Sequence, residues 1–553
     1  MLQIGVLAPV ATAEDIAVFS SNSALVKRNH RIHFLDKDMA VKRELKLHES
    51  MIAPRGILSP DGSHLWVMTR RRSDRVVELA VYDMVTTREL GRIEVGRQPI
   101  QAEWQQFWLR ISEDGSLLFT LAWENKRWFV KTYSTDTREL VSKTRLVAGQ
   151  LEMTLLPGDR LLVRKGYRKR RTFLVDPVRG VELWRYTLDV HDQLSITPTG
   201  KTLILTSRTQ EEIKVRERAR WNYFSGWHST AILLDIATGK VGRELDLGFD
   251  PTDPSFSPDN TSGWLMSRDS IRDGGNILWR VTDSGIKQHA TFEPFCNPAG
   301  VVVSETHNLA TLVCDKAIFV HRLDTNRRLF ASEIESGRWQ GLYDDDASHL
   351  YLTGIGRPRS SLYRTQPLEH IASRRVGSDG VRFGLVSANI VGVASALLIG
   401  TSRLYINPLS GRTAQLSHDQ SHYYVVNEGT FDVTALDAQT FEKRNTVPVG
   451  PDFLGMAKLG AAQRMHVFGS RSLLVFGADG VEPALDLDSG WFLGVSESRD
   501  RMYYMTNEAL DVYRISDLER VHSLPVLNRA YHVLAPDTYS PNRIATERPE
   551  MKN

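Results

Sequence analysis

The sequence has few of the residues and runs that usually indicate metal binding, haem attachment or membrane insertion. Its 553 residues include only two cysteines, and no Cys-x-x-Cys or Cys-x-x-Cys-His pattern occurs, so nothing indicates a zinc site or a c-type haem. No apolar run approaches the roughly 18 residues that predict a membrane-spanning helix. The formal net charge is only +3, so binding of a polyanion would depend on where the charges lie and not on their sum.

Motifs of common enzyme classes are also missing. The chain contains no HExxH, GxSxG, P-loop or Rossmann fingerprint, and its sixteen histidines show no metal-ligand spacing. We therefore expect no catalytic, cofactor-binding or metal-binding residue and no cofactor, and an enzyme is the less favoured class. An active site in a central channel would draw single residues from many repeats and would leave no such motif.

What the sequence does contain is a repeating pattern of short strands. Residues 57–99 predict four strands in roughly 45 residues, which is the size of one β-propeller blade. The first strand ends in the turn Ser59-Pro60-Asp61-Gly62, where proline presets φ and glycine accepts a positive φ. The next strands follow at 64–68, 76–83 and 89–95. With 41% hydrophobic residues the chain has enough apolar material for a large core.

This stretch resembles the SPDG-type blade of YVTN and WD40-like β-propellers. The pattern recurs with drift along the chain, for instance from Ile111 to Gly115 and from Ile196 to Gly200. We count about eleven or twelve units, and one propeller normally holds four to eight blades. The predicted fold is therefore all-β, with tandem β-propellers built from four-stranded blades. The predicted domains are a first propeller of about seven blades at 1–335, a second of about five at 336–540, and a tail at 541–553. A six-plus-six split remains open.

The compartment follows from the interpretation of the N-terminus and of the two cysteines. Residues 6–9 align with the strand before Asp61, so we interpret them as the first strand of blade one and not as a signal peptide, which favours the cytoplasm. A periplasmic or secreted protein is the alternative. Cys296 and Cys314 flank a predicted hairpin, so a disulfide is feasible in an exported protein, and two reduced thiols are the default in a cytoplasm.

Acidic residues recur at the ends of the predicted third strands, and we interpret them as turn residues and not as catalytic carboxylates. A carboxylate at that position accepts backbone N–H bonds in the following turn. The residues are Asp36, Asp83, Asp136, Asp176, Asp235 and Asp437, and the same applies to Asp61, Asp114 and Asp259.

Basic residues gather in the predicted connections between the second and third strands of the first blades. Antiparallel alternation places these connections on one side of a propeller, so we expect one basic face there. Aromatic residues interleave with the charges in a long insert at 211–228, and this combination suits stacking on bases. The expected partner-binding residues are Arg28, Arg31, Arg70, Arg71, Arg72, Lys126, Arg127, Arg168, Lys169, Arg170, Arg171, Lys214, Arg216, Arg218, Arg220, Trp221, Tyr223 and Trp227.

The insert at 211–228 is longer than a hairpin turn, so we expect a contact loop or, as the alternative, a cap folded over the propeller. Together the patterns predict a non-enzymatic scaffold with protein partners in a larger assembly. Its basic face would dock an acidic partner, either nucleic acid or an acidic protein surface. The alternative is an exported YVTN-like or quinoprotein-like propeller enzyme or binding protein, because residues 175–184 resemble a repeat of propellers that bind a quinone cofactor.

Overall fold

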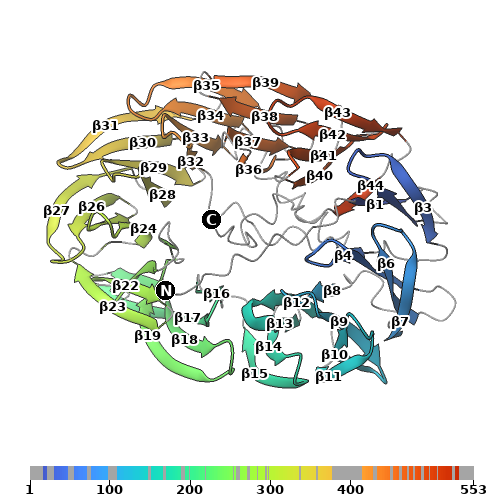
Figure 1. Ribbon diagram of the computed structural model, residues 1–553. Helices are drawn as coiled ribbons and strands as arrows, with labels where there is room; N and C mark the ends of the chain where they lie inside the picture. Colours follow the sequence, from blue (N-terminus) through green and yellow to red (C-terminus); the bar gives the residue numbers. More distant parts are fainter. Residues whose placement is uncertain are drawn as a thin grey trace, which may run out of the picture.

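The computed structural model describes residues 16–534 with gaps (Figure 1). Gaps of four or more residues fall at 22–29, 48–54, 71–75, 98–108, 147–150, 166–169, 189–192, 257–261, 271–274, 377–413, 428–431, 449–452, 460–463, 487–490 and 526–529, and shorter ones include 218–219. The described residues are almost entirely β-strand, arranged in four-stranded antiparallel units around a common centre. The prediction of an all-β propeller built from four-stranded blades is confirmed.

The first eleven strands include the stretch from which the repeat was recognised. β4 to β7 lie where the sequence predicted the four strands of residues 57–99. The strands are β1 (Ile16–Ser21), β2 (His30–Leu35), β3 (Val41–Leu47), β4 (Arg55–Leu58), β5 (His64–Arg70), β6 (Val76–Asp83), β7 (Glu89–Arg97), β8 (Leu109–Ile111), β9 (Leu117–Glu124), β10 (Arg127–Ser134) and β11 (Leu140–Leu146).

The next twelve strands include two that are much longer than the others, β17 and β18. This part also holds a short 3-10 turn, η2 (Pro157–Asp159). The strands are β12 (Leu151–Leu156), β13 (Arg160–Lys165), β14 (Arg170–Asp176), β15 (Val181–Leu188), β16 (Gln193–Ile196), β17 (Thr202–Glu217), β18 (Arg220–Asp235), β19 (Val241–Phe249), β20 (Ser255–Phe256), β21 (Gly263–Arg268), β22 (Asn276–Thr282) and β23 (Gly285–Phe292).

The remaining strands continue the same pattern as far as residue 534. They are β24 (Pro298–Ser304), β25 (Leu309–Cys314), β26 (Ala317–Arg322), β27 (Arg328–Glu333), β28 (Arg338–Tyr343), β29 (His349–Ile355), β30 (Arg359–Thr365), β31 (Leu368–Arg375), β32 (Ala414–Leu416), β33 (His422–Asn427), β34 (Asp432–Asp437), β35 (Lys443–Pro448), β36 (Phe453–Leu459), β37 (Arg464–Gly469), β38 (Ser472–Gly477), β39 (Gly480–Asp486), β40 (Trp491–Ser496), β41 (Arg501–Met505), β42 (Leu510–Arg514), β43 (Arg520–Leu524) and β44 (Ala530–Leu534).

Among the described residues the strands form seven four-stranded sheets and two eight-stranded sheets. Each eight-stranded sheet is two four-stranded units joined by one residue pair, Arg97↔Trp123 in one and Phe249↔Arg268 in the other. The number of units thus agrees with the lower of the two counts expected from the repeat. The sheets do not test whether the repeats are of the YVTN or SPDG type.

The innermost strand of the first blade comes from the far end of the chain. β44 pairs antiparallel with β1, with Ala17 opposite Leu534 and Val18 opposite Val533. The sequence pattern predicts residues 6–9 for that place, and these lie outside the described residues. That assignment is wrong for the described sheet, because β44 already occupies the edge of β1. Similarity between two stretches of sequence cannot distinguish a strand supplied locally from one supplied by the last blade.

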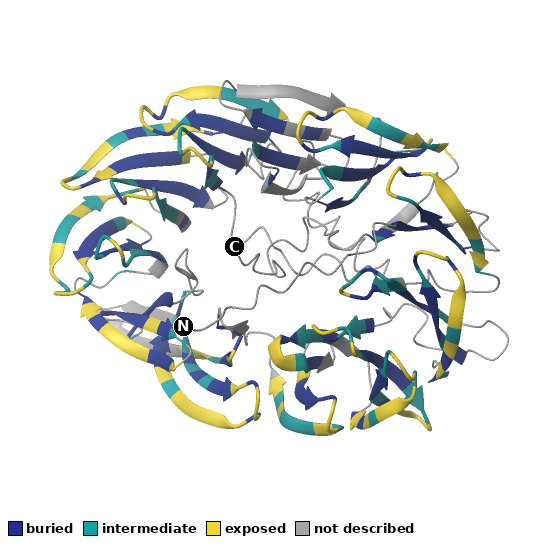
Figure 2. Ribbon diagram, viewed as in Figure 1, coloured by how far each residue is buried: buried dark blue, intermediate teal, exposed yellow. Residues whose placement is uncertain are grey.

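Apolar side chains between neighbouring blades make the core. Figure 2 shows the inner and middle strands buried and the outer strands, such as β3 and β7, mostly exposed. Ile204 and Leu233 of one blade share a cluster with Leu265 and Ile277 of the next. Burial of this kind stabilises by roughly 25 cal/mol per Å² of apolar surface, so each blade depends on both neighbours.

The predicted break at residue 335 falls between two blades that pack on each other. Val302 and Val313 of β24 and β25 share an apolar cluster with Trp339 and Leu350 of β28 and β29. Figure 1 shows the blades following one another in one round, so the tandem arrangement of two rings is not seen. A repeat count does not reveal where a ring closes, because every blade presents the same kind of apolar face. The domain boundaries predicted at residues 335 and 540 stay a prediction.

The recurring aspartates act as turn residues. The Asp83 carboxylate accepts the Thr86 N–H at 2.6 Å, and Asp235 accepts the Thr238 N–H at 2.7 Å. Asp36, Asp176 and Asp437 accept backbone N–H groups in the same way, as do Asp61 and Asp114 in the preceding turns. Asp136 is an exception: the third strand of its blade ends at Ser134, and the Ser134 hydroxyl accepts the N–H of Thr137 in the following turn. Asp259 lies outside the described residues.

Candidate interaction surface: a projecting hairpin and its root

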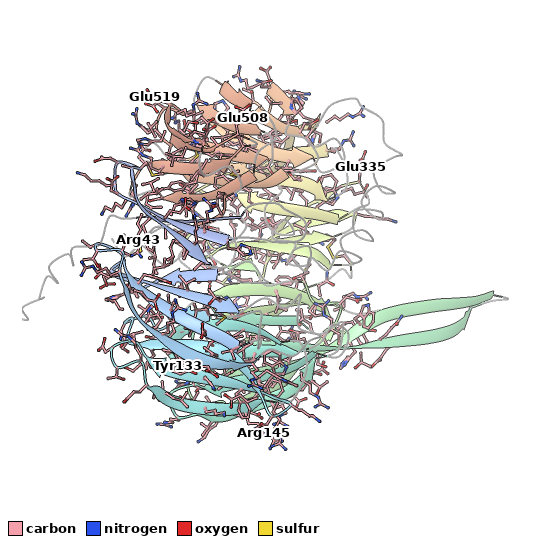
Figure 3. The ribbon with its side chains drawn as sticks, turned by 90° about the vertical axis from the view of Figure 1, so that its right-hand side faces the viewer. Arg43, Tyr133, Arg145, Glu335, Glu508 and Glu519 are labelled. Atoms are coloured by element: carbon pink, nitrogen blue, oxygen red, sulfur yellow. A yellow bond between two sulfur atoms is a disulfide. The ribbon has the colours of Figure 1, made fainter. Side chains whose placement is uncertain are left out.

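The β17–β18 hairpin extends far beyond the blade to which it belongs. The ladder is continuous from Thr202↔Asp235 at the blade to Glu217↔Arg220 near the tip. Figure 3 shows it as the green hairpin that leaves the ring on one side. The sequence analysis expected a long loop here, and that expectation is wrong: the insert continues the two strands of the blade. Alternation of β-branched or aromatic residues with polar ones, as in residues 213–216, was the available signal.

The outer part of this hairpin, residues 208–229, is called the arm below. β16 pairs with β17 only as far as Thr206, and β19 pairs with β18 only from His228 inward. β19 thus reaches the first two pairs of the arm, and within the described strands no third strand accompanies the arm beyond them. An isolated two-stranded hairpin is marginally stable in water, so the arm depends on how it is anchored or on what it contacts.

Asp250 anchors the arm to the neighbouring blade. Its carboxylate Oδ1 accepts the Trp227 N–H at 2.9 Å, and its own N–H donates to the Trp227 carbonyl at 2.9 Å. The other carboxylate oxygen forms an ion pair with the Arg268 guanidinium at the end of β21. Asp250 has a φ of 48°, a left-handed conformation that Asp tolerates better than most residues. One residue therefore ties the arm to two blades.

Arg268 is itself buried, with only 5% of its surface exposed. Burial lowers the pKa of the guanidinium from its ordinary value, although an arginine stays charged in proteins. Gly248, with φ of 74°, passes so close that an added Cβ would lie 2.1 Å from the Arg268 carbonyl oxygen. Only glycine fits this position, so the root of the arm is packed against β21 without slack.

A second contact pair flanks the root. His228 Nε2 lies 3.0 Å from Asp246 Oδ1, and the His228 ring meets the Phe249 ring edge-on at 5.0 Å between centroids. The Gly248 N–H donates to the same Asp246 carboxylate oxygen at 2.8 Å. With Asp250, these contacts hold β18 at the point where the hairpin leaves the ring.

A second hairpin at the equivalent position of another blade is short. β9 and β10 are joined by Asn125 and Lys126, whose φ values of 48° and 61° are those of a tight two-residue turn. Lys126 and Arg127 are exposed, and that they contact a partner stays a prediction. The rings of Trp123 and Trp128 meet at 5.3 Å across the strands below the turn. The turn therefore presents its cations on a stiff base.

Glu124, which could neutralise these cations, is engaged elsewhere. Its carboxylate forms ion pairs with Lys131, which is buried, and with Lys143 of β11. Lys131 also donates to the Val95 carbonyl of the preceding blade at 2.5 Å. Desolvation raises the pKa of Glu124, but the hydrogen bonds from the two lysines outweigh it and the pKa is lowered. The carboxylate is therefore held ionised by groups within the blades.

The other predicted contact residues are described to different extents. Arg171 is exposed at the start of β14. Arg31 forms an ion pair with Glu44 of β3 at 2.8 Å, so its charge is partly compensated. Trp227 is half-buried at the root of the arm. For Arg70, Arg170, Lys214, Arg216, Arg220, Trp221 and Tyr223 only the strand position is described, and Arg28, Arg71, Arg72, Arg168, Lys169 and Arg218 lie outside the described residues.

Strand order places the described members on one side of the ring. The connections β9–β10, β13–β14 and β17–β18 each join the second strand of a blade to its third, and such connections emerge on the same side. That their cations form one continuous basic surface was not tested and stays a prediction.

The structure joins Cys296 and Cys314 by a disulfide, with Cα atoms 5.7 Å apart. The sequence had left this pairing open. Asn276 Nδ2 lies 2.7 Å from the Cys296 sulfur, so the bond is next to the start of β22. Within the described ranges no group of three or more His, Cys, Asp or Glu side chains is placed to hold a metal ion. In the same residues no helix is long and apolar enough to cross a membrane.

Comparison with known proteins gives structural likeness only. No known family and no curated protein matches the sequence. Among solved structures, a eukaryotic initiation factor is 12% identical with a TM-score of 0.31, covering 66% of this chain and 95% of that chain. Apo AztD from Citrobacter koseri is 12% identical with a TM-score of 0.31, covering 67% and 91%. The C-terminal WD40 domain of Sif2 is 12% identical with a TM-score of 0.28, covering 60% and 89%. At these values the likeness carries no functional argument.

Proposed function

We propose that the protein is a propeller-based interaction scaffold whose arm-bearing side docks an acidic partner, either nucleic acid or an acidic protein surface. The observation that carries the proposal is the arm. Its two strands continue well past the blade and are fixed at the root by Asp250. Beyond the root no third strand pairs with them within the described strands. The packing of the blades does not need such an extension. Long extensions of compact folds commonly bind a partner.

The charges on this side support an anionic partner. Lys126 is exposed in the β9–β10 turn, and Arg127 and Arg171 are exposed near the starts of β10 and β14. Glu124, next to the turn, is bound by Lys131 and Lys143. The far part of the arm, residues 213–221, carries four basic residues against the single acid Glu217. Basic side chains on one side of an otherwise near-neutral protein attract polyanions over a distance of about 10 Å at moderate salt.

Shortening the arm tests the proposal. Deleting residues 213–216 and 221–224 removes four facing pairs, Lys214 and Arg216 among them, and keeps the register of the remaining ladder. We expect full-length protein to bind immobilised duplex DNA or polyglutamate at low salt and to elute as salt rises, and the shortened protein to elute earlier. Its melting temperature should stay within a few degrees, because the arm adds little to the core. Equal elution of both proteins, or failure of the intact protein to bind any polyanion, would reject the proposal.

The disulfide favours the second candidate, an exported propeller enzyme or binding protein, because disulfides persist mainly in oxidising compartments. Thiol titration of protein isolated directly from cells decides between the two. Two free thiols in freshly isolated protein would speak for a reducing compartment and against the exported version.

A further inference from the structure

We propose that the arm enters the major groove of double-stranded DNA as a two-stranded β-ribbon. The inference rests on the proposed function, because it names the acidic partner that the arm-bearing side would dock. It commits to duplex DNA, and an acidic protein, an RNA duplex and a single strand become outcomes of the test.

The dimensions of the arm suit this groove. Ten facing pairs run from Arg208↔Ser229 to Glu217↔Arg220, which corresponds to a reach of roughly 30 Å at the usual rise per residue. Two paired strands lie about 4.8 Å apart, and the major groove of B-DNA, about 12 Å wide, admits a two-stranded ribbon. Because no third strand is described beyond the first two pairs of the arm, its width there is that of the ribbon alone.

The register places cationic and aromatic residues on one face of the ribbon. Facing residues of an antiparallel pair share a face, and successive pairs alternate between faces. Lys214↔Tyr223 and Arg216↔Trp221 are two positions apart and therefore lie on the same face. The intervening pair, Val215↔Asn222, occupies the other face. Lys214 and Arg216 therefore share one face near the tip, whereas Arg220, opposite Glu217, belongs to the other face. A face with two cations and two aromatic residues suits a strongly anionic partner.

Because the arm projects from a fixed root, duplex DNA suits it better than the other anionic partners do. Proteins that bind single strands line a groove with aromatic side chains and let the strand follow it, whereas a projecting ribbon offers no such groove. The major groove of an RNA duplex is deep and too narrow for protein elements. An arm held by Asp250 and Arg268 points in one direction, so it requires a partner with a regular groove.

The first experiment measures binding of the full-length protein to four fluorescent probes: a 24-base-pair DNA duplex, the RNA duplex of the same sequence, one DNA strand and polyglutamate. We expect DNA duplex to bind most tightly. K214E together with R216E should weaken duplex binding by about 30-fold and should reduce the slope of log K against log salt by about two. The matched control, K240E with R243E, makes the same charge change in the same blade on exposed residues at the opposite end of the strands, and should stay within threefold.

A second measurement needs no variant. Dimethyl sulfate methylates guanine N7 in the major groove and adenine N3 in the minor groove, so wild-type protein should protect N7 and leave N3 reactive. Protection of N3 alone, or equal affinity for the DNA and RNA duplexes, would overturn groove insertion. Binding of polyglutamate without binding of DNA would overturn it while leaving the proposed docking function intact. Absence of binding to every probe at low salt would reject both proposals.

Discussion

Two hairpins occupy the same place in their blades and differ in almost everything else. β9–β10 closes in the two-residue turn Asn125-Lys126, and its charges sit directly on the blade. β17–β18 continues for ten further pairs and carries its charges away from the ring. The short hairpin is held from within, by Lys131 and Glu124. The long one is held from outside, by Asp250 of the β19–β20 connection and Arg268 of β21.

The difference shows that a blade hairpin can be lengthened without changing the blade, whereas its direction must be fixed by contacts with a neighbouring blade. A ladder can be lengthened pair by pair without changing the blade, because each added pair satisfies its own backbone groups. Its direction is not set by the ladder, and here it is set by a compact group of contacts at the root. Substitutions can break each anchor separately, and we expect the largest effects at the root of the arm.

Replacing Gly248 with alanine should have the largest effect. The residue combines a φ of 74° with a Cβ position 2.1 Å from the Arg268 carbonyl oxygen, so the backbone must move. We expect a loss of about 3 kcal/mol in the free energy of unfolding, measured by urea titration. Gly242→Ala in the same strand is the control, because its nearest neighbour is 3.9 Å away. Equal costs for the two variants would show that the root is not tightly packed.

Asp250→Ala should cost about 2 to 3 kcal/mol, because it leaves the buried Arg268 without its carboxylate and the Trp227 N–H without its acceptor. Asp250→Asn should cost less, since the amide oxygen can still accept the N–H bond. Limited trypsin digestion should cut the alanine variant in the arm sooner than wild type. Glu244→Gln, at an exposed residue of β19 that lies opposite Ile232 and therefore outside the arm, serves as the control. An arm in the alanine variant that resists trypsin as wild type does would contradict the anchoring function.

In the short hairpin, Lys131→Met should cost about 1 to 2 kcal/mol, because the Val95 carbonyl and the Glu124 carboxylate both lose a charged donor. Lys143→Met removes the other partner of Glu124 and should cost about 0.5 kcal/mol, because the Lys143 side chain is 35% exposed. Thermal unfolding of the two variants measures the difference. The ranking would be reversed if the exposed lysine were the main anchor.

The smallest expected effect is the acid sensitivity of the same anchor. Because the pKa of Glu124 is lowered in the folded protein, its contribution is complete above the ordinary value of 4.5 and is lost as the pH falls through the lowered pKa. Glu124→Gln should therefore be less stable than wild type at pH 7, and the gap should narrow in acid. Urea titrations at several pH values measure this gap, and a gap independent of pH would show that the carboxylate charge does not matter.

Much of the fold could be predicted because the turn residues of the repeat mark where each strand begins and ends. The turn chemistry of Asp83 and Asp235 and the four strands of residues 57–99 follow from local patterns, and local patterns are what a sequence displays directly. Ring closure could not be predicted this way. The pairing of Val18 with Val533 joins the two ends of the fold, and no local signal distinguishes it from pairing with a nearby strand.

The candidate surface was predicted by composition and missed in geometry. The basic and aromatic residues of 211–228 marked the segment, but its length suggested a loop because hairpin turns are usually short. The anchors were missed entirely. Asp250 and Arg268 are ordinary charged residues in sequence, and their function depends on two blades meeting at one point.

The closure of the first blade by β44 also bears on synthesis. β1 emerges from the ribosome roughly 500 residues before the strand that completes its sheet, an interval of about 25 to 100 seconds at ordinary elongation rates. During that interval the inner edge of β1 has no native partner, and an open strand edge is a template for pairing with other chains. The first blade is therefore incomplete until β44 has been synthesised, and a nascent chain would need protection of the β1 edge until then.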